Sequence, residues 1–321
     1  MPLIENSSYR PPRILFNAHL QTIYPALFRK VALPPYQRER IHTMDDDFLD
    51  LDWLRKGSKR LVILSHGLEG DTSRPYLKGM AKAFYDNSWD CLAWNYRGCS
   101  GETNKQLRFY HSGATDDLEF VINHALKKNH YHEILLIGFS LGGNLTLKYL
   151  GEQRDKLIPQ IKKAIVFSVP LDLYTSCLKL SQPSNYIYSR RFLISLKGKV
   201  TTKSVAMPGK FNLDHFSSIN RIMDFDDFYT APIHGYENAK HYYSVCSSIS
   251  FLDKIAIPTL IINALNDPFL SKECFPYDLL KNHKTVFFES PSEGGHCGFA
   301  VFNNNQYWSE MRALEFAGQA G

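Results

Sequence analysis

The fold of this chain is decided by the stretch Ile134-Leu135-Leu136-Ile137-Gly138-Phe139-Ser140-Leu141-Gly142. Its first four residues form a continuous apolar run, which is typical of a strand buried on both faces of a parallel sheet. The residues from Gly138 to Gly142 match G-x-S-x-G, in which a serine occupies a tight, strained turn between a strand and a helix. A stretch of helical length, residues 141–150, follows Ser140 without a break. The motif alone also arises by chance, but its context of strand and helix predicts that Ser140 is a nucleophile.

The same rhythm of strand and helix continues on both sides of this stretch. Short apolar runs recur at residues 61–64, 91–94, 164–167, 258–262 and 285–288, and amphipathic stretches of helical length lie at residues 75–85, 114–126 and about 306–316. Nearer the N-terminus, residues 40–43 and 48–54 bracket Asp45-Asp46-Asp47, which indicates a hairpin turn. Alternating strands and helices predict an α/β fold with a mostly parallel central sheet flanked by helices.

The alternation stops after Pro170. Residues 171–250 are aromatic, polar and basic without the strand rhythm, so we expect a helical cap inserted between two strands, over the carboxyl edge of the sheet. Residues 1–170 would then form the N-terminal part of the α/β core, and residues 251–321 would form its C-terminal part. Residues 1–36 are Pro-rich and aperiodic, and we expect them to wrap the surface of the domain.

Two further loops carry the partners that a serine nucleophile needs. In folds with this motif the chain order is Ser, then Asp or Glu, then His. Asp267 follows the apolar run 258–262, and His296 lies among glycines after the run 285–288. We therefore predict a catalytic triad of Ser140, Asp267 and His296. The alternative for Asp267 is a plain turn carboxylate, because an Asp before a proline is a common turn signal.

Two other carboxylates compete for the role of the acid. Asp253 precedes its strand and therefore belongs to the wrong end of the sheet. Glu293 lies too close in sequence to His296 for the two side chains to face each other easily. Asp267 remains the preferred acid.

The first buried run ends in Ser65-His66-Gly67-Leu68-Glu69-Gly70. A turn of this His-Gly type supplies one donor of an oxyanion hole, and the amide after the nucleophile supplies the other. The candidate donors are the backbone N–H groups of Leu68 and Leu141. His66 is expected to shape the turn rather than to move protons.

Composition and charge argue against several other classes of protein. The 321 residues include 37 lysines and arginines and 32 acidic residues, a net charge of +5, and no dense basic run indicates a nucleic-acid partner. Six scattered cysteines show no metal-ligand spacing, so we expect reduced thiols. The chemistry of the predicted triad requires no metal and no cofactor. Neither a leader pattern nor a run of 18 apolar residues is visible, which predicts a cytoplasmic protein without integral membrane association. The sequence leaves the oligomeric state open.

With these residues identified, the chain resembles the AB hydrolase-4 family, the YheT-like α/β-hydrolases. The resemblance extends from about Phe16 onward. It rests on the motifs Asn17-Ala18-His19-Leu20-Gln21-Thr22, His66-Gly67-Leu68-Glu69-Gly70, Arg97-Gly98-Cys99-Ser100-Gly101-Glu102, Tyr110-His111-Ser112-Gly113, Gly138-Phe139-Ser140-Leu141-Gly142-Gly143-Asn144, Ile233-His234-Gly235-Tyr236, Asp267-Pro268-Phe269 and Gly294-Gly295-His296-Cys297-Gly298-Phe299.

The resemblance implies an α/β-hydrolase fold with a helical cap and carboxylic-ester hydrolase activity on short- to medium-chain acyl esters. It places the family triad on Ser140, Asp267 and His296. Two positions depart from the family pattern: Asn266 stands where a second Asp is common, and Cys297 stands where Val is frequent. Neither departure removes a catalytic group.

Three functions are open at this point. The expected one is a serine esterase that acts on a small-molecule acyl ester through an acyl-enzyme intermediate. An acyltransferase, in which an alcohol replaces water in the second step, would use the same residues, and some eukaryotic relatives transfer acyl groups in this way. A catalytically inactive binding protein on the same fold is the alternative from a different class.

The motifs also highlight residues with structural interpretations. Arg97, in a loop flanked by glycine, is expected to organise ion pairs rather than to clamp a substrate. His19 and His111 are expected to hold loops through hydrogen bonds. Four aromatic residues of the cap either line an acyl pocket or pack within the cap, namely Tyr186, Tyr188, Phe192 and Phe225.

Overall fold

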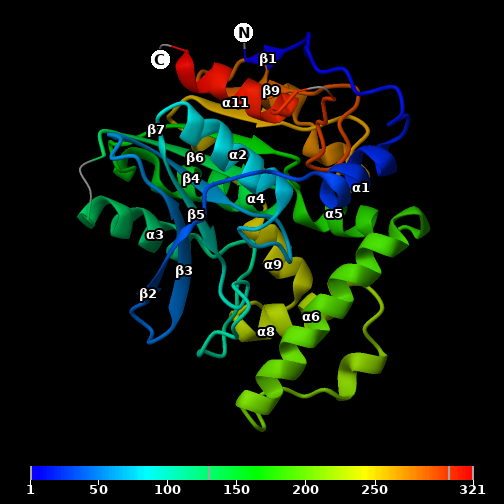
Figure 1. Ribbon diagram of the computed structural model, residues 1–321. Helices are drawn as coiled ribbons and strands as arrows, with labels where there is room; N and C mark the ends of the chain where they lie inside the picture. The colour runs from blue at the N-terminus through cyan, green and yellow to red at the C-terminus, as the bar shows by residue number, and fades with distance from the viewer. Residues whose placement is uncertain (1, 129–130, 303, 320–321) are drawn as a thin grey trace.

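The computed structural model describes residues 2–128, 131–302 and 304–319. Its central sheet consists of β1 (Leu3–Ile4), β2 (Gln37–His42), β3 (Phe48–Leu54), β4 (Arg60–Ser65), β5 (Asp90–Asn95), β6 (Glu133–Phe139), β7 (Ile161–Phe167), β8 (Thr259–Ile262) and β9 (Val286–Glu289). Their order across the sheet is β1-β9-β8-β7-β6-β4-β5-β3-β2 (Figure 1). β3 pairs antiparallel with β2 and with β5, and the other neighbouring strands pair parallel. The mostly parallel sheet and the hairpin are thereby confirmed.

Helices cover both faces of this sheet. α3 (Thr115–Lys128) and α4 (Leu141–Gln153) pack on one face, and α2 (Pro75–Asp86) and α11 (Trp308–Gly318) pack on the other. These four helices lie where the amphipathic stretches predicted them, within a few residues at each end. Because every predicted strand and helix of the alternation is present, the expected α/β architecture is confirmed.

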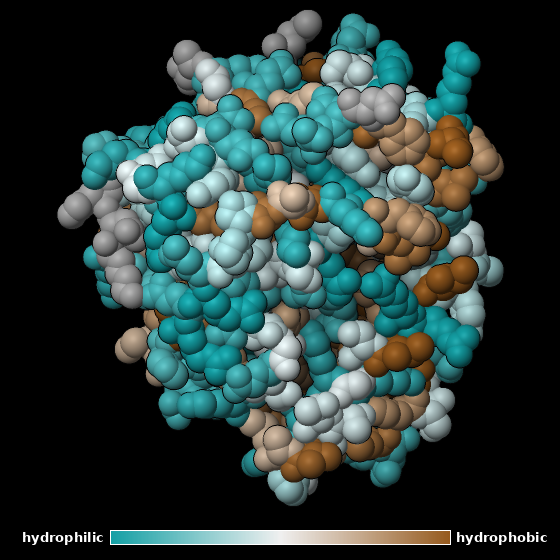
Figure 2. All heavy atoms as spheres, viewed as in Figure 1, coloured by the Kyte–Doolittle hydropathy of each residue, from teal (hydrophilic) through white to brown (hydrophobic). Residues whose placement is uncertain are grey.

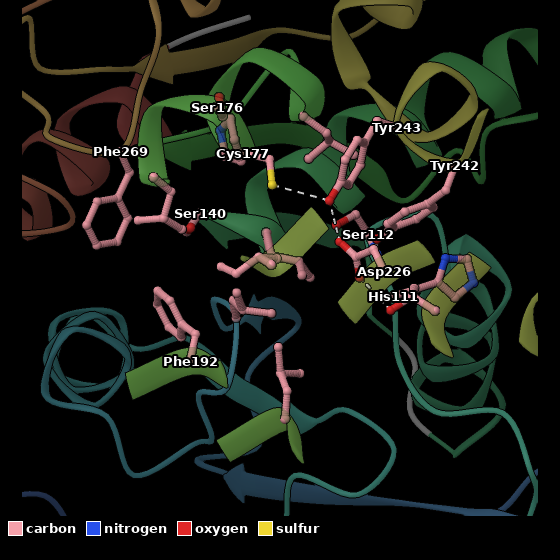
Figure 3. Close-up of a pocket in the computed structure, with 18 of the residues that line it drawn as sticks. His111, Ser112, Ser140, Ser176, Cys177, Phe192, Asp226, Tyr242, Tyr243 and Phe269 are labelled. Carbon is pink, nitrogen blue, oxygen red and sulfur yellow. Dashed lines mark hydrogen bonds between the residues drawn. The ribbon is translucent and has the colours of Figure 1, made fainter. Parts of the chain in front are cut away.

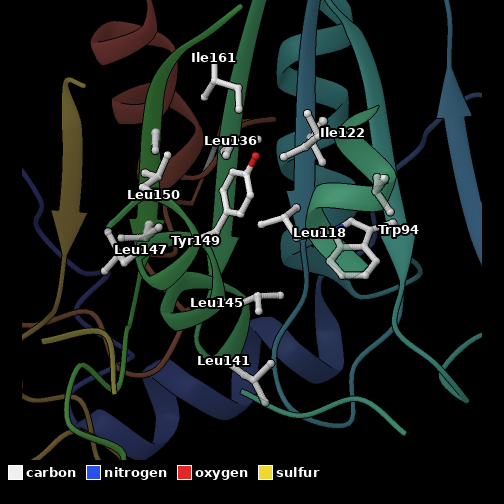
Figure 4. Close-up of a cluster of buried hydrophobic side chains, with 14 of the residues drawn as sticks. Trp94, Leu118, Ile122, Leu136, Leu141, Leu145, Leu147, Tyr149, Leu150 and Ile161 are labelled. Atoms are coloured by element: carbon white, nitrogen blue, oxygen red, sulfur yellow. The ribbon is translucent and has the colours of Figure 1, made fainter. Parts of the chain in front are cut away.

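The strands show why two layers of helices are needed. In β4, Leu61 and Ile63 belong to the core beneath α3 and α4, whereas Val62 and Leu64 belong to the core beneath α2 and α11. Successive side chains of a strand point to opposite faces, so a continuous apolar run must be covered on both sides. Figure 4 shows the first of these cores, in which side chains of α3 face the Tyr149 ring of α4.

The first 36 residues contain two elements that the sequence did not reveal. β1 adds a strand beyond β9, with Leu3 opposite Phe288. α1 (Ala18–Phe28) begins after Asn17, whose side chain accepts a hydrogen bond from the Leu20 N–H. Pro25 lies inside α1 and has no N–H to donate. Because a proline normally argues against a helix interior, the sequence pattern did not predict this helix. The expectation that this segment only wraps the surface was therefore incomplete.

A series of short and long helices lies between β7 and β8, and we call it the cap. It contains α5 (Leu173–Leu180), α6 (Tyr186–Ala206), α7 (Ile222–Phe225), a π-helical turn (Asp226–Thr230), α8 (Ala231–Ile233) and α9 (Ala239–Cys246). Figure 1 shows α6 and its neighbours projecting from one side of the sheet, away from both chain termini. The cap has a buried apolar core of its own, which includes Val200 and Phe225. The helical insertion is present as predicted, while the exact domain limits at 171 and 250 remain a prediction.

The topology also fixes where functional groups gather. The loops that follow β4, β6, β8 and β9 all leave the same edge of the sheet, because these four strands run parallel to one another. In open α/β sheets this carboxyl edge is where ligands bind. The predicted site residues all belong to these loops.

Candidate active site

Ser140 stands at the turn between β6 and α4 in a backbone conformation that few side chains adopt. Its φ is 53° and its ψ is −119°. The neighbouring glycines are required by close packing: a Cβ on Gly138 would lie 2.3 Å from the Gly142 carbonyl oxygen, and a Cβ on Gly142 would lie 2.4 Å from the Ser65 carbonyl oxygen. The Ser140 N–H donates to the Phe167 carbonyl at 2.8 Å, which helps to hold the strained turn.

Three side chains from three loops form one hydrogen-bonded chain. His296 Nε2 lies 3.0 Å from Ser140 Oγ, and His296 Nδ1 lies 2.9 Å from Asp267 Oδ2. An ionised carboxylate only accepts hydrogen bonds, so Nδ1 carries the proton that it donates to Asp267. Nε2 is then free of a proton and accepts from the Ser140 hydroxyl. The structure thus brings together the three residues that motif and chain order predicted.

The surroundings of His296 favour its protonated form. Burial lowers the pKa of the imidazole, but the Asp267 carboxylate and the neighbouring Cys297 raise it by more, so the pKa of His296 lies above its ordinary value of 6.5. Asp267 is only 4% exposed, so little solvent weakens this interaction. The Phe269 ring lies over the imidazole with a centroid distance of 4.1 Å. His296 is therefore held in position on two sides.

Helix α1 holds the loops that carry Asp267 and His296. The His296 N–H donates to Thr22 Oγ1 at 2.9 Å. Gln21 Oε1 accepts from the Gly294 N–H at 2.9 Å and from Asn266 Nδ2 at 2.9 Å. One buried amide oxygen therefore joins the loop that carries Asp267 to the loop that carries His296.

Sequence reasoning assigned no role to Gln21 and Thr22. Both residues lie in a motif that carries the family resemblance, and this motif was the signal by which they could have been found. A linear motif, however, does not say which distant loop it contacts. Glu293, which competed for the role of the acid, accepts instead from Gln21 Nε2 at 3.0 Å. Glu293 therefore helps to hold Gln21, the residue that joins the two loops.

The His-Gly turn after β4 lies beside the turn that carries Ser140. Leu68 and Leu141, the candidate oxyanion donors, line the same cavity as Ser140. His66 is fully buried, with Nδ1 2.8 Å from the Gly67 carbonyl oxygen. Burial lowers the pKa of His66 to about 4, so it stays neutral at physiological pH. These contacts fit the structural role expected for His66.

Glu69 connects this turn to the cap, which the sequence did not predict. Its carboxylate accepts from Lys199 Nζ of α6 at 2.8 Å and from the Ser195 hydroxyl of the same helix. The Tyr110 hydroxyl donates to the carboxylate at 2.5 Å and lies 2.9 Å from the Glu69 N–H. Because Glu69 follows Leu68 directly, the position of the candidate oxyanion amide is coupled to the position of α6.

Two cavities meet at Ser140. The smaller, of about 120 Å³, extends between the sheet edge and the cap and is lined mainly by apolar side chains. The larger, of about 420 Å³, opens between α1 and α6. The residues that line both are Leu68, Ser140, Phe192, Phe269 and His296. The Ser140 hydroxyl therefore stands at the junction of a small, mainly apolar space and a larger space with more polar lining.

The four aromatic residues of the cap divide between the two roles left open by the sequence. Phe192 lines both cavities, and Tyr188 lines the larger one. Phe225 is 1% exposed and packs in the core of the cap. Tyr186 is 61% exposed and does neither.

The remaining motif residues hold loops. Arg97 is buried and pairs with three carboxylates, those of Asp45, Asp47 and Asp117, at 2.8 to 2.9 Å. This ion-pair role is the one that the sequence favoured over a substrate clamp. His19 Nδ1 lies 3.0 Å from the Tyr188 hydroxyl. The His111 ring accepts a hydrogen bond from the Gly113 N–H at 3.2 Å.

Neither a metal-binding cluster nor a membrane-spanning helix occurs in the part of the chain that the structure describes. No group of three or more His, Cys, Asp or Glu side chains there is arranged to hold a metal ion. None of the helices in residues 2–128, 131–302 and 304–319 combines the length and the apolar character needed to cross a membrane.

The fold and the site define the class of the protein as an α/β-hydrolase. The solved structure of the esterase Pf2001 from Pyrococcus furiosus superimposes with a TM-score of 0.58, covering 90% of this chain and 94% of that chain at 16% sequence identity. At this identity the likeness shows the fold alone. Residues 56–209 also match a family of hydrolases described as serine aminopeptidase, S33.

Relatives identify the family within that class. YheT of Escherichia coli (strain K12) is 35% identical over 317 residues, which are 96% of this chain and 92% of YheT. YheT is provisionally named an esterase. Phospholipase ABHD3 of Homo sapiens is 28% identical over 278 residues, 83% of this chain and 68% of that protein. The chain belongs to the AB hydrolase-4 family, the YheT-like α/β-hydrolases, and its relatives bear the names of esterases and lipases.

Proposed function

We propose that the protein is a serine carboxylic-ester hydrolase that acts on short- to medium-chain acyl esters. The observation that carries this proposal is the continuous hydrogen-bonded chain from Ser140 through His296 to Asp267, located where two cavities meet. The names of the relatives agree with it, since one is called an esterase and another a phospholipase. No cofactor or metal takes part in the proposed reaction.

The reaction proceeds by two acyl transfers. His296 Nε2 takes the Ser140 proton while Oγ forms a bond to the ester carbonyl carbon, and the Leu68 and Leu141 amides stabilise the oxyanion. The proton then passes from His296 to the leaving alcohol as the C–O bond breaks. Water, deprotonated by the same imidazole, releases the acid from Ser140. Asp267 keeps the imidazole in the required tautomer and stabilises its cation.

The two cavities suggest how the halves of the ester are placed. The smaller cavity is mainly apolar, which suits an acyl chain. The larger one has more polar lining, which suits the alcohol. Its rim carries Leu27 of α1 and Ile187 of α6, which are 62% and 72% exposed. Figure 2 shows apolar side chains gathered over α1 and α6 on this side of the molecule.

The direct test is the hydrolysis of p-nitrophenyl esters of two to twelve carbons by the wild type and by Ser140→Ala. We expect Ser140→Ala to lower kcat by about 10⁴-fold or more, because removal of the nucleophile leaves only the oxyanion site and substrate binding. Ser176→Ala is a matched control, since this serine lines the same cavity but its hydroxyl contacts Cys274 Sγ, at 3.1 Å, while Ser140 contacts His296. Turnover that survives in Ser140→Ala would identify a different nucleophile.

A fluorophosphonate probe separates an active enzyme from a binding protein on the same fold. We expect it to label the wild type at Ser140 and to leave Ser140→Ala unlabelled. Product analysis with added alcohol then compares hydrolysis with acyl transfer. Predominant formation of a new ester instead of free acid would replace the hydrolase by a transferase.

A further inference from the structure

The smaller cavity ends on a carboxylate. Figure 3 shows Ser140 with Phe192 and Phe269 at one side of this cavity and Asp226 with Tyr243 at the other. The space between them is bordered by apolar side chains, among them Leu173, Leu180, Leu196 and Ile222. An acyl chain bound to Ser140 and extended along this cavity would therefore meet a polar group at its far end.

Asp226 is buried, and its two hydrogen-bond donors use only part of the capacity of its carboxylate to accept hydrogen bonds. The side chain is 8% exposed, and burial raises its pKa from 3.8 to about 6. The Thr230 hydroxyl donates to Oδ1 at 2.5 Å, and the Tyr243 hydroxyl donates to Oδ2 at 2.5 Å. A carboxylate can accept about four hydrogen bonds, so about two acceptor positions remain beyond these contacts.

No cation within the described residues compensates the Asp226 carboxylate. Among the described residues, no Lys, Arg or His nitrogen lies within ion-pair distance of Asp226, whereas the nearby Asp224 is paired with Arg221 at 2.6 Å. Buried charges in proteins normally have a partner of opposite charge or a metal ion. A buried carboxylate that borders a ligand cavity without such a partner points to a partner that enters with the ligand.

The local backbone directs this carboxylate inward. Asp226 opens the π-helical turn Asp226–Thr230, an irregularity that often occurs at functional sites. Asp227, the next residue, is exposed and accepts from the Ala239 N–H at 2.6 Å. Of the two adjacent carboxylates, only Asp226 lines the cavity of Ser140.

We propose that the smaller cavity selects acyl groups that carry a hydrogen-bond donor, a hydroxyl or an ammonium, at the end far from the ester. This proposal rests on the proposed esterase function and names its substrate class. A chain that ends in a methyl group removes water from Asp226 without replacing the hydrogen bonds, which is unfavourable. A chain that ends in a donor replaces them. Asp226 is thus a specificity-determining residue for the acyl group.

The first experiment uses the wild-type protein and three sets of methyl esters with acyl chains of four to ten carbons. One set ends in a methyl group, one in a hydroxyl and one in an ammonium. At the best length we expect kcat/KM for a donor-terminated ester to exceed that of the plain ester of equal length by about tenfold or more. The hydroxyl and ammonium sets show which donor is preferred. Equal or higher kcat/KM for the plain esters at every length would overturn the proposal.

The second experiment changes the carboxylate. Asp226→Asn keeps the shape of the side chain but removes its charge, and we expect the preference for the ammonium ester to fall by about tenfold. Asp227→Asn is the matched control and should keep the wild-type ratio. Tyr243→Phe removes one donor to Asp226 but leaves the carboxylate, so the preference should persist. A wild-type ratio in Asp226→Asn would show that this carboxylate has only a structural role.

The two proposals fail in different ways. If the esterase proposal is wrong, no ester of any set is hydrolysed in a manner that depends on Ser140. If only the acyl-group proposal is wrong, plain esters are hydrolysed and their turnover still depends on Ser140. The wild-type comparison among the three sets also decides the matter if Asp226→Asn does not fold, because it requires no variant.

Discussion

The His296 backbone N–H donates to Thr22 Oγ1 at 2.9 Å, so a helix near the N-terminus positions a histidine near the C-terminus. Thr22 Oγ1 in turn donates to the Ala18 carbonyl at 2.7 Å, which fixes the hydroxyl on α1. This contact sets the backbone from which the imidazole reaches Ser140. Thr22 is therefore a positioning residue for the proposed base.

Replacing Thr22 by Val tests this role. The isosteric side chain cannot accept the hydrogen bond, so the His296 loop loses one fixed point and we expect kcat to fall about tenfold with little change in KM. Thr22→Ser keeps the acceptor and should retain most of the activity. Steady-state kinetics on a p-nitrophenyl ester provides the measurement. An unchanged kcat in Thr22→Val, with a folded protein by circular dichroism, would contradict the role.

The pKa of His296 predicts the pH dependence of hydrolysis. Burial alone would lower this pKa, but Asp267 and Cys297 raise it above 6.5, so the neutral base form becomes dominant only at a higher pH. We expect kcat/KM to rise with pH and to reach half of its maximum above pH 6.5. Asp267→Asn removes the carboxylate charge, so it should shift this midpoint to lower pH while kcat falls by about 10⁴-fold. A midpoint below 6.5 in the wild type would argue against the raised pKa.

The Arg97 cluster predicts a large effect on stability. Replacing Arg97 by Met leaves the buried Asp47 without its paired cation and leaves the buried Asp117 with only the longer pair to Arg108 at 3.9 Å, so we expect the free energy of unfolding to fall by about 3–5 kcal/mol. Lys82→Met breaks the exposed pair with Asp86 and should cost about 0.5 kcal/mol or less. Urea denaturation at pH 7.5 measures both. Similar losses of unfolding free energy in the two variants would show that the buried Arg97 ion pairs stabilise the fold no more than an exposed pair does.

Asp226 predicts a different pH dependence, that of folding. Its pKa is raised from 3.8 to about 6 by burial, so the folded protein binds this proton more tightly than the unfolded chain does. The stability that results is fully present below pH 3.8 and is lost as the pH rises through about 6. Between pH 4 and 8, the unfolding free energy of Asp226→Asn relative to the wild type should therefore increase by up to about 3 kcal/mol. A constant difference across this range would mean that Asp226 titrates normally.

Much of the fold follows from local sequence. Apolar runs such as residues 134–137 are long enough for strands and too short for most helices, and their alternation with amphipathic stretches leaves little choice of architecture. Parallel strands then place the loops after β6, β8 and β9 at one edge. This is why chain order alone was enough to bring Ser140, Asp267 and His296 together in the prediction.

What the sequence did not reveal depends on contacts between distant segments. Residues 224–227 contain three carboxylates, and their order does not say which one is buried. In the structure Asp224 pairs with Arg221 and Asp227 is exposed, whereas Asp226, the first residue of the π-helical turn, lines the cavity. The link from Glu69 to Lys199 was hidden for the same reason, since it joins a loop of the core to a helix of the cap.

The anchoring of the histidine loop by α1 has a consequence for the order of events during translation. The turn that carries Ser140 lies more than 150 residues before His296. The elements β4, β6 and α4 therefore leave the ribosome long before residue 296 is synthesised. α1 is synthesised before all three of these elements, but it has no histidine loop to hold until residues 294–298 follow. A polypeptide that ends before residue 296 can therefore display its serine without a positioned imidazole beside it.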